Sequence, residues 1–443
     1  MNKSHTIIPN GRIEKSSFSS NWKEYSFKDF CDITSSKRIF YREYVKSGIP
    51  FYRSKEIIAK SNGKELNDCL YISKDRFEEI KNKYGIPING DILITAVGTY
   101  GIPYLINEDG DFYFKDGNLI WLKNIKDVAD SNFLFYWFKS EEAKNKVEGI
   151  IIGSVQKALT IDAMKNIKIN LPPLAEQKRI ASILSALDDK IELNNKTNKI
   201  LEEMAQTIFK EWFINFNFPN EDGKPYKKSG GEMIDSELGK IPKGWKVGTI
   251  GDIAREVICG KTPPTKDKEN YGSYMPFITI PDMHNNIYVV KTEKYLSKKG
   301  VNTQSKKTIP KNSICVSCIA TVGVVSLVSE YSQTNQQINS IIPKGKVSSY
   351  WVYFYIKNIK DMIINYASSG TTTLNLNKSQ FEKIKIIIPS DNLFMSFNEI
   401  AKSLFDMIRN NQIENEKLSN IRDSLLPKLM TPKGRRADGE IRI

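Results

Sequence analysis

The sequence predicts an α+β protein with two globular domains in tandem. Each domain is followed by a long helix, and the two helices are expected to pair as an antiparallel coiled coil. Two observations predict this fold class. The first is an internal repeat with a period of about 220 residues, far longer than the repeats of solenoid proteins. The second is that each copy begins with short apolar runs typical of strands and ends in a long amphipathic stretch typical of a helix.

The repeat is recognised from segments that match in the same order along the chain. They are Trp22-Lys23 with Trp245-Lys246, residues 48–52 (GIPFY) with 274–278 (YMPFI), residues 89–94 (NGDILI) with 311–316 (KNSICV), Gly153 with Gly370, and residues 167–169 (IKI) with 384–386 (IKI). A chain of 443 residues can form two or three domains, each with its own core. We therefore expect a molecule that performs one kind of task at two places.

The order of elements follows from apolar runs and from breaker residues. Strands are expected at 91–95, 118–122, 167–171, 313–317 and 384–389, and helices at 76–83, 132–146 and 349–366. Prolines and glycines between the copies predict an exposed connector. The expected segments are an N-terminal tail at 1–20, a domain at 21–173, a helix at 174–216, a linker at 217–243, a domain at 244–391, a helix at 392–429 and a C-terminal tail at 430–443.

Both long helices carry positions spaced alternately four and three residues apart, the spacing of a coiled-coil seam. In the first helix these positions are Ile180, Leu184, Leu187, Ile191, Asn194, Asn198, Leu201, Ala205, Ile208 and Trp212. In the second helix they are Ile400, Leu404, Met407, Asn411, Glu414, Leu418, Ile421, Leu425 and Lys428. Two matched helices can bury these seams on each other, with Asn194 and Asn198 fixing the register at a cost in stability.

Positive charge is concentrated in the globular parts. The net charge is +14, although the two long helical stretches carry nearly equal numbers of acidic and basic residues. Lysine-rich composition alone could explain an excess of this kind, but its location favours a polyanionic partner such as nucleic acid. The chain lacks an apolar run long enough to cross a membrane, and its start lacks the apolar core of a signal peptide, so we expect a cytoplasmic protein.

A search for catalytic or metal-binding motifs favours a chain that is not an enzyme. Residues 315–318 (CVSC) have the spacing of a metal site but lie in a predicted strand, where neighbours three apart face opposite sides. Asp282 lacks the second acid and the lysine spacing of a nuclease motif, and only two histidines are present for acid–base chemistry. We predict neither a metal nor a cofactor in this chain.

Several motifs resemble those of the specificity (S) subunits of type I restriction-modification enzymes. They are residues 171–180 (LPPLAEQKRI), 238–245 (LGKIPKGW), 260–263 (GKTP), 276–280 (PFITI), 335–339 (NQQIN), 425–429 (LLPKL) and 439–443 (GEIRI). The first copy departs from this pattern, with residues 35–37 (SSK) and 116–118 (DGN) at the positions of 260–263 and 335–337.

The resemblance implies two target-recognition domains, each reading half of a bipartite DNA site, with the helices as a spacer between them. It also implies partners: double-stranded DNA, two methyltransferase subunits and two motor-nuclease (restriction) subunits. S-adenosylmethionine, ATP and magnesium would then belong to those subunits. Two alternatives stay open, a coiled-coil scaffold that does not bind DNA and a nuclease or methylase with an unrecognised site.

Candidate DNA-binding residues lie beside loops at equivalent positions of the two copies. For phosphate contacts we expect Lys37, Arg38, Lys157 and Lys261. For base contacts and their surroundings we expect Thr99, Tyr100, Ser154, Gln156, Thr262, Thr321, Gln336, Gln337, Thr371, Thr372 and Thr373. Amide and hydroxyl side chains suit base edges, because a glutamine can bond an adenine bidentately and a threonine methyl group can pack on thymine. The same residues, flanked by glycines, could instead simply form turns.

Overall fold

The computed structural model describes residues 22–63, 66, 68–108, 110–151, 157–368 and 374–431. The chain divides into two compact units, one of Met1–Asp189 with Ser419–Ile443 and one of Lys190–Leu418. Both boundaries fall inside long helices, so each of these helices belongs partly to each unit. None of the helices in the described ranges has the length and apolar character that a bilayer crossing requires.

The first unit contains short strands with helices between them. Its elements are β1 (Lys23–Ser26), α1 (Phe27–Phe30), β2 (Asp32–Thr34), β3 (Tyr44–Val45), β4 (Ile49–Tyr52), α2 (Ser54–Ser61), β5 (Leu70–Ile72), α3 (Lys74–Tyr84), β6 (Ile92–Thr95), β7 (Pro103–Leu105), β8 (Tyr113–Phe114), β9 (Leu119–Lys123), α4 (Ser131–Lys139), α5 (Glu141–Glu148), α6 (Ile161–Lys165), β10 (Lys168–Leu171) and the start of α7 (Leu174–Phe209). The sheet orders are β1-β10, β2-β9-β6-β7 and β3-β5-β4-β8.

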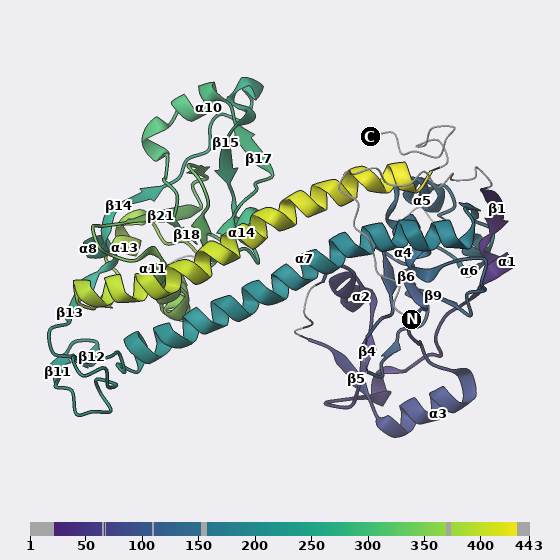
Figure 1. Ribbon diagram of the computed structural model, residues 1–443, viewed down its shortest axis with the longest axis horizontal. Helices are drawn as coiled ribbons and strands as arrows, with labels where there is room; N and C mark the ends of the chain where they lie inside the picture. Colours follow the sequence, from purple (N-terminus) through teal and green to yellow (C-terminus); the bar gives the residue numbers. More distant parts are fainter. Residues whose placement is uncertain are drawn as a thin grey trace, which may run out of the picture. The chain divides into compact units, whose positions relative to one another are not determined.

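The second unit repeats this plan. Its elements are β11 (Met233–Ser236), β12 (Gly239–Pro242), β13 (Lys246–Thr249), α8 (Ile250–Ile253), β14 (Ala254–Cys259), β15 (Tyr271–Ile278), α9 (Ile280–Met283), β16 (Tyr288–Val289), β17 (Lys294–Leu296), α10 (Lys298–Asn302), β18 (Ile314–Ser317), β19 (Val325–Val328), β20 (Gln333–Thr334), β21 (Ile338–Pro343), α11 (Ser349–Asn358), α12 (Lys360–Ser368), α13 (Lys378–Glu382), β22 (Lys385–Ile388) and most of α14 (Asp391–Leu429). The sheet orders are β13-β22, β14-β21-β18-β19-β16 and β17-β15-β20, besides the hairpin β11-β12. Strands β15 and β17 and helix α10 form a small lobe of this unit (Figure 1).

The strand register demonstrates the duplication. In the first unit Phe51 pairs with Leu70 on one side and Tyr113 on the other. In the second unit Phe277 pairs with Lys294 and Gln333, again with one antiparallel and one parallel neighbour. The predicted α+β tandem is therefore confirmed, and residues of the two copies can be matched through their strand pairing.

The two long helices pack together as an antiparallel pair. In the second unit the Asn194 amide donates to Glu414 Oε2 at 2.8 Å, and the Asn411 amide donates to Asn198 Oδ1 at 2.8 Å. As α7 advances, its partners in α14 recede, which makes the helices antiparallel. In the first unit Arg422 forms an ion pair with Asp188 at 2.6 Å.

The middle of the seam is polar, as the sequence predicts. Asn194 is only 3% exposed and also donates to Asn415 Oδ1 at 2.8 Å. The bond from Asn194 lowers the pKa of Glu414, and Lys190 adds to this effect. A buried amide needs a hydrogen-bond partner, and a shifted register would remove the partners of Asn194. This polar layer therefore favours a single register of α7 against α14.

The predicted seam positions are buried or half-buried throughout α7 but partly exposed in α14. All ten predicted positions of α7 are buried or half-buried, but Ile400, Met407 and Ile421 of α14 are exposed. In their place α14 buries Phe405 and Ile408 in the core of the second domain. The spacing rule missed this because α14 packs against a globular domain as well as against α7.

Each long helix contributes to both cores. The start of α7 packs in the first core through Ile180 and Leu184, and Leu429 of α14 joins the same cluster. In the second unit Phe209, near the end of α7, contacts Phe354 with ring centroids 5.6 Å apart. A π-helical turn, Lys210–Ile214, then ends α7.

Two helices expected to be continuous are each divided. Ser140 separates α4 from α5, because its hydroxyl donates to Trp137 O and accepts from Ala143 N, capping α5. In the second copy Ile359 separates α11 from α12. Apolar periodicity alone reveals neither break, and at Ser140 a local side-chain cap begins the second helix.

The connector between the copies is more ordered than the expected exposed linker. It contains the hairpin of β11 and β12, and Ile241 is buried. The Phe218 ring stacks on Tyr226 and on Trp245, with centroids 4.6 and 5.4 Å apart. Its glycines and prolines make turns as expected, but its aromatic side chains fasten it to the second domain.

Candidate nucleic-acid interface

Each domain presents a loop after an inner strand of a sheet, β6 in the first domain and β18 in the second, and the same hydrogen bonds shape both loops. In the first domain the Thr95 hydroxyl accepts from Ile102 N at 3.0 Å. In the second domain the Ser317 hydroxyl accepts from Val324 N at 2.9 Å. A side-chain hydroxyl at the strand end therefore closes each loop and holds its tip in the solvent.

A later segment of the chain runs beside each loop. Leu159 N donates to Ala96 O at 2.8 Å in the first domain, and Leu376 N donates to Cys318 O at 2.9 Å in the second. This pairing places the exposed Lys157 near the exposed Thr99. Tyr100, by contrast, is half-buried and packs against the core, so its ring supports the loop.

Five of the predicted base-reading residues lie outside the described residues. They are Ser154, Gln156, Thr371, Thr372 and Thr373. The described residues that follow them, Lys157 and Leu374, stand at the loops just discussed.

In the second domain two more segments converge on the same loop. Lys261 N donates to Thr334 O at 2.9 Å, and Cys318 N donates to Gln337 O at 2.8 Å. These bonds join the segment of Lys261 to the strand connection at Gln337 and to the loop that carries the exposed Thr321. The structure thus brings together predicted residues that are far apart in sequence.

Gly260 makes this convergence possible. A β-carbon at position 260 would lie 2.2 Å from Asn335 O and 2.2 Å from the hydroxyl oxygen of Thr334. Both distances are far below van der Waals contact, so a side chain would push the segments apart. This explains why the GKTP motif begins with glycine.

The two glutamines of the second domain differ in their freedom. Gln336 is exposed, and its Oε1 accepts from the Thr262 hydroxyl at 2.6 Å, which leaves the amide NH₂ free for other acceptors. Gln337 is half-buried, and its Oε1 accepts from the Asn335 amide at 3.0 Å within the turn. Gln336 is therefore the better candidate for a base contact, and Gln337 also has a structural role.

In the first domain the corresponding residues gather in a similar way. Lys37 N donates to the Tyr113 hydroxyl at 2.7 Å, and the Arg38 guanidinium pairs with Asp116 at 2.8 Å. The amino group of Lys37 lies 4.5 Å from the centre of the Tyr84 ring. The carboxylate of Asp116 offsets much of the charge of Arg38, so Lys37 and Lys157 are the stronger phosphate candidates.

Sequence reasoning missed an exposed aromatic pair next to these residues. Phe40 is 53% and Tyr41 90% exposed, and the Arg42 guanidinium lies 5.7 Å from the Phe40 ring centre. Glu43 holds the turn by accepting from Phe40 N and pairing with Arg76. The run of residues 40–42 (FYR) after two basic residues was the signal that could have found it, since exposed aromatics are common at binding surfaces.

The residues considered for chemistry have structural roles. Cys315 and Cys318 lie in two different core clusters, as predicted for strand neighbours three apart, and burial raises the pKa of each thiol to about 12. Asp282 accepts hydrogen bonds from Thr279 N and Glu293 N, both at 2.8 Å, so its carboxylate is used to cap the backbone. Over the described ranges, no three histidine, cysteine or acidic side chains group as a metal site would require.

The fold and the loops together define a tandem recognition protein. It contains two domains of one kind, and each domain presents polar and basic loops and is followed by a long helix. The family described as the type I restriction modification DNA specificity domain matches residues 19–203 and 242–423. This chain belongs to that family. It is a non-catalytic DNA specificity subunit of a type I restriction-modification system, in which the cofactors reside on the methyltransferase and restriction subunits.

Individual relatives and a solved structure are similar to this chain over nearly its whole length. The type I restriction enzyme HindI specificity subunit of Haemophilus influenzae is 33% identical over 464 residues, covering 93% of this chain and 99% of the relative. The MjaIX specificity subunit of Methanocaldococcus jannaschii is 30% identical, covering 98% and 95%. The crystal structure of a type I S subunit from M. genitalium shares the fold with a TM-score of 0.58 at 16% identity, covering 96% of this chain and 98% of that one.

Proposed function

We propose that each target-recognition domain reads one half of a bipartite, gapped DNA site, and that α7 and α14 set the gap. The observation that carries this proposal is the repeated loop scheme with different side chains. Equivalent hydrogen bonds close the loops of Thr99 and Thr321, and they place Lys157 beside the first loop and Leu374 beside the second. Loops that share a backbone arrangement but carry different side chains can read two different half-sites on one DNA duplex.

The domain boundaries that we propose are those expected from the sequence, with recognition domains at 21–173 and 244–391 and spacer helices at 174–216 and 392–429. At about 1.5 Å per residue, a 36-residue helix such as α7 is roughly 54 Å long. We further propose a cytoplasmic complex with two methyltransferase and two restriction subunits.

The proposal is tested by reconstituting the complex with its methyltransferase subunits and sequencing the DNA that it modifies. We expect a motif of two unlike specific parts separated by bases without preference. A continuous motif, or methylation with no sequence preference, would contradict the proposal. Binding to DNA that does not weaken with salt would favour the alternative of a scaffold.

Replacing Lys37, Arg38, Lys157 and Lys261 together by alanine should make DNA binding less sensitive to salt. Each lost phosphate contact lowers the slope of log affinity against log salt by about 0.9. The measurement is the dissociation constant of the assembled complex across a salt series. The control removes four exposed lysines elsewhere in the two domains (Lys23, Lys74, Lys306 and Lys346), and an equal change of slope in both variants would contradict the assignment.

The methyltransferase subunits have a candidate docking surface on α7. Leu193, Ile200 and Met204 are 57%, 57% and 50% exposed, and their spacing of seven and four residues places them in one stripe along the helix. A stripe of large apolar side chains on a subunit of a complex is well suited to a protein partner. We propose that this stripe contacts a methyltransferase subunit.

Changing Leu193 and Ile200 to glutamate should therefore weaken assembly at least about tenfold, or about 1.4 kcal/mol, while leaving the melting temperature close to that of the wild type. Analytical ultracentrifugation with the purified methyltransferase subunit measures this. Ser403→Glu with Asn410→Glu adds the same charges at the same spacing on exposed positions of α14. Normal assembly of the α7 variant would eliminate the stripe as a docking surface.

A further inference from the structure

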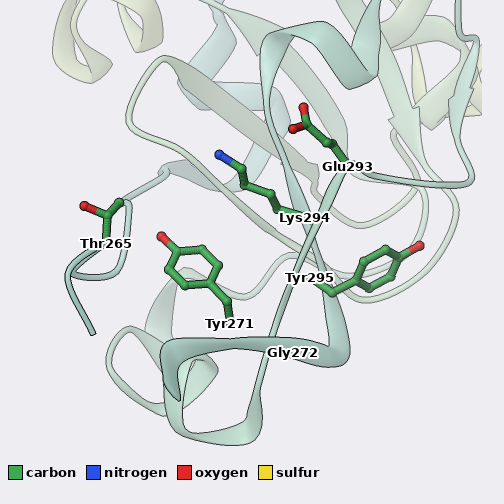
Figure 2. Close-up of a pocket in the computed structure, with 6 residues that line it drawn as sticks. All are labelled: Thr265, Tyr271, Gly272, Glu293, Lys294 and Tyr295. Atoms are coloured by element: carbon green, nitrogen blue, oxygen red, sulfur yellow. The ribbon is translucent and has the colours of Figure 1, made fainter. Parts of the chain in front are cut away.

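A surface depression lies in the small lobe of the second domain. It has a volume of about 410 Å³ and is lined by Thr265, Tyr271, Gly272, Glu293, Lys294 and Tyr295. In Figure 2 the amino group of Lys294 and the hydroxyl group of Tyr271 point toward a common space, Thr265 lies across that space, and Tyr295 points away from it. One cation and one hydroxyl group directed into the same space form a donor set for a phosphate oxygen.

The donors of this depression are available for a ligand. Lys294 is exposed, and no acidic side chain of the described ranges forms an ion pair with it. The Tyr271 hydroxyl donates to Pro263 O at 3.3 Å, which is long for an O–H donor, so an anionic acceptor would compete well. Glu293 also lines the depression, and its carboxylate limits the affinity for a free anion.

The depression continues the candidate nucleic-acid interface of the same domain. Thr265 lies four residues after Lys261, so the two are at most roughly 14 Å apart. The Pro263 and Pro264 carbonyls accept from Tyr271 and from the Asn270 amide, which fixes the intervening loop. A DNA strand has one phosphate per about 3.4 Å of helix rise, so one stretch of backbone can reach both positions.

At the register-equivalent position the first domain has a leucine in place of the cation. Lys294 pairs with Phe277 across β17 and β15, and the register-equivalent pair in the first domain is Leu70 with Phe51. Leu70 packs against a hydrophobic cluster of that domain. The charge of Lys294 is thus particular to the second copy at this register position, unlike the loops that both copies share.

We infer that this depression binds a backbone phosphate of the DNA next to the half-site read by the second domain, with Lys294 and Tyr271 as the contacting residues. The inference rests on the proposed function, and it adds a sequence-independent contact on one side of the bipartite site. The two half-sites are then held unequally, with more phosphate contacts on the side of the second domain.

The test uses the assembled complex with its methyltransferase subunits and a duplex that carries the methylated motif. Lys294→Ala should lower the salt slope of binding by about 0.9 and weaken cognate and random DNA by a similar factor. Tyr271→Phe, which keeps the ring, should weaken binding less. Lys306→Ala, which removes an exposed charge from the same domain outside the depression, should leave the slope unchanged.

A scan with single uncharged methylphosphonates locates the contact. One position flanking the second half-site should weaken the wild type but not Lys294→Ala, and no such position should flank the first half-site. An unchanged salt slope in Lys294→Ala would overturn the inference, as would equal sensitivity of both proteins at every position. Inorganic phosphate binding by the DNA-free complex that is lost in Lys294→Ala, with DNA binding unaltered, would assign the depression to a free anion and also overturn it.

The two ideas fail in different ways. If the wild-type complex shows no preference for a bipartite motif, the proposed function is wrong. If the wild type recognises such a motif and Lys294→Ala behaves like Lys306→Ala, only the inference about the depression is wrong.

Discussion

Leu184→Asp should destabilise the first unit by several kcal/mol. Leu184 is fully buried in the cluster that joins the start of α7 to the first domain and to the end of α14. An aspartate there loses the apolar contacts of leucine and buries a carboxylate without a partner, for which a cost of about 3–5 kcal/mol is reasonable. Because whole domains are stable by only about 5–15 kcal/mol, much of this unit's stability would be lost.

Urea unfolding followed by circular dichroism measures this change, and assembly with the methyltransferase subunits should fall with it. Leu187→Asp should cost less, because Leu187 is half-buried. Ser182→Asp is the matched control, since Ser182 lies on the same helix, two residues earlier, and is exposed. If Leu184→Asp unfolds at the same urea concentration as the control, α7 does not pack as the structure describes.

Gln336→Ala should relax recognition of one half-site only. The Gln336 side chain is exposed and is oriented by the hydroxyl of Thr262, so its NH₂ group is available to a base edge. Its Oε1 keeps a second lone pair, so Gln336 can bond a base edge bidentately, and losing that contact costs about 1–3 kcal/mol, or roughly five- to 150-fold in affinity for the cognate site. Affinity for random DNA should barely change, because phosphate contacts dominate it.

Sequencing of the DNA methylated by the variant complex provides the measurement, together with the affinity for cognate and random duplexes. Asn302→Ala is the control, because it removes an exposed amide of the same domain outside the loop cluster. Relaxation in both halves of the motif would show that Gln336 supports the fold. An equal loss on random DNA would instead place Gln336 at a phosphate.

Much of the architecture could be predicted from the sequence, because its causes are local or repeated. Strands such as β6 and β18 arise from short apolar runs, and the start of α7 follows two prolines that favour a helix entry. The seam of α7 followed from spacing alone. The neutral helices and basic domains came from counting charges along the chain.

What the sequence could not determine depends on contacts between distant segments. The buried face of α14 is set by the domain that it packs against, so Met407 of the predicted seam is exposed while Phe405 is buried. The connector is ordered because Phe218 stacks on Trp245, a contact that no local rule predicts.

The candidate site divides in the same way. The sequence by itself determined the duplicated fold, the family and the residue types at the loops, because motif spacing and composition are linear properties. Only the tertiary structure decided which of these residues meet. In the structure the amide NH₂ of Gln336 is available, whereas the side chain of Gln337 bonds within a turn. Arg38 forms an ion pair with Asp116. Lys294 lines one depression together with Tyr271 and Thr265. The physical reason is that hydrogen bonds and ion pairs between segments far apart in sequence decide which side chains remain available to a ligand.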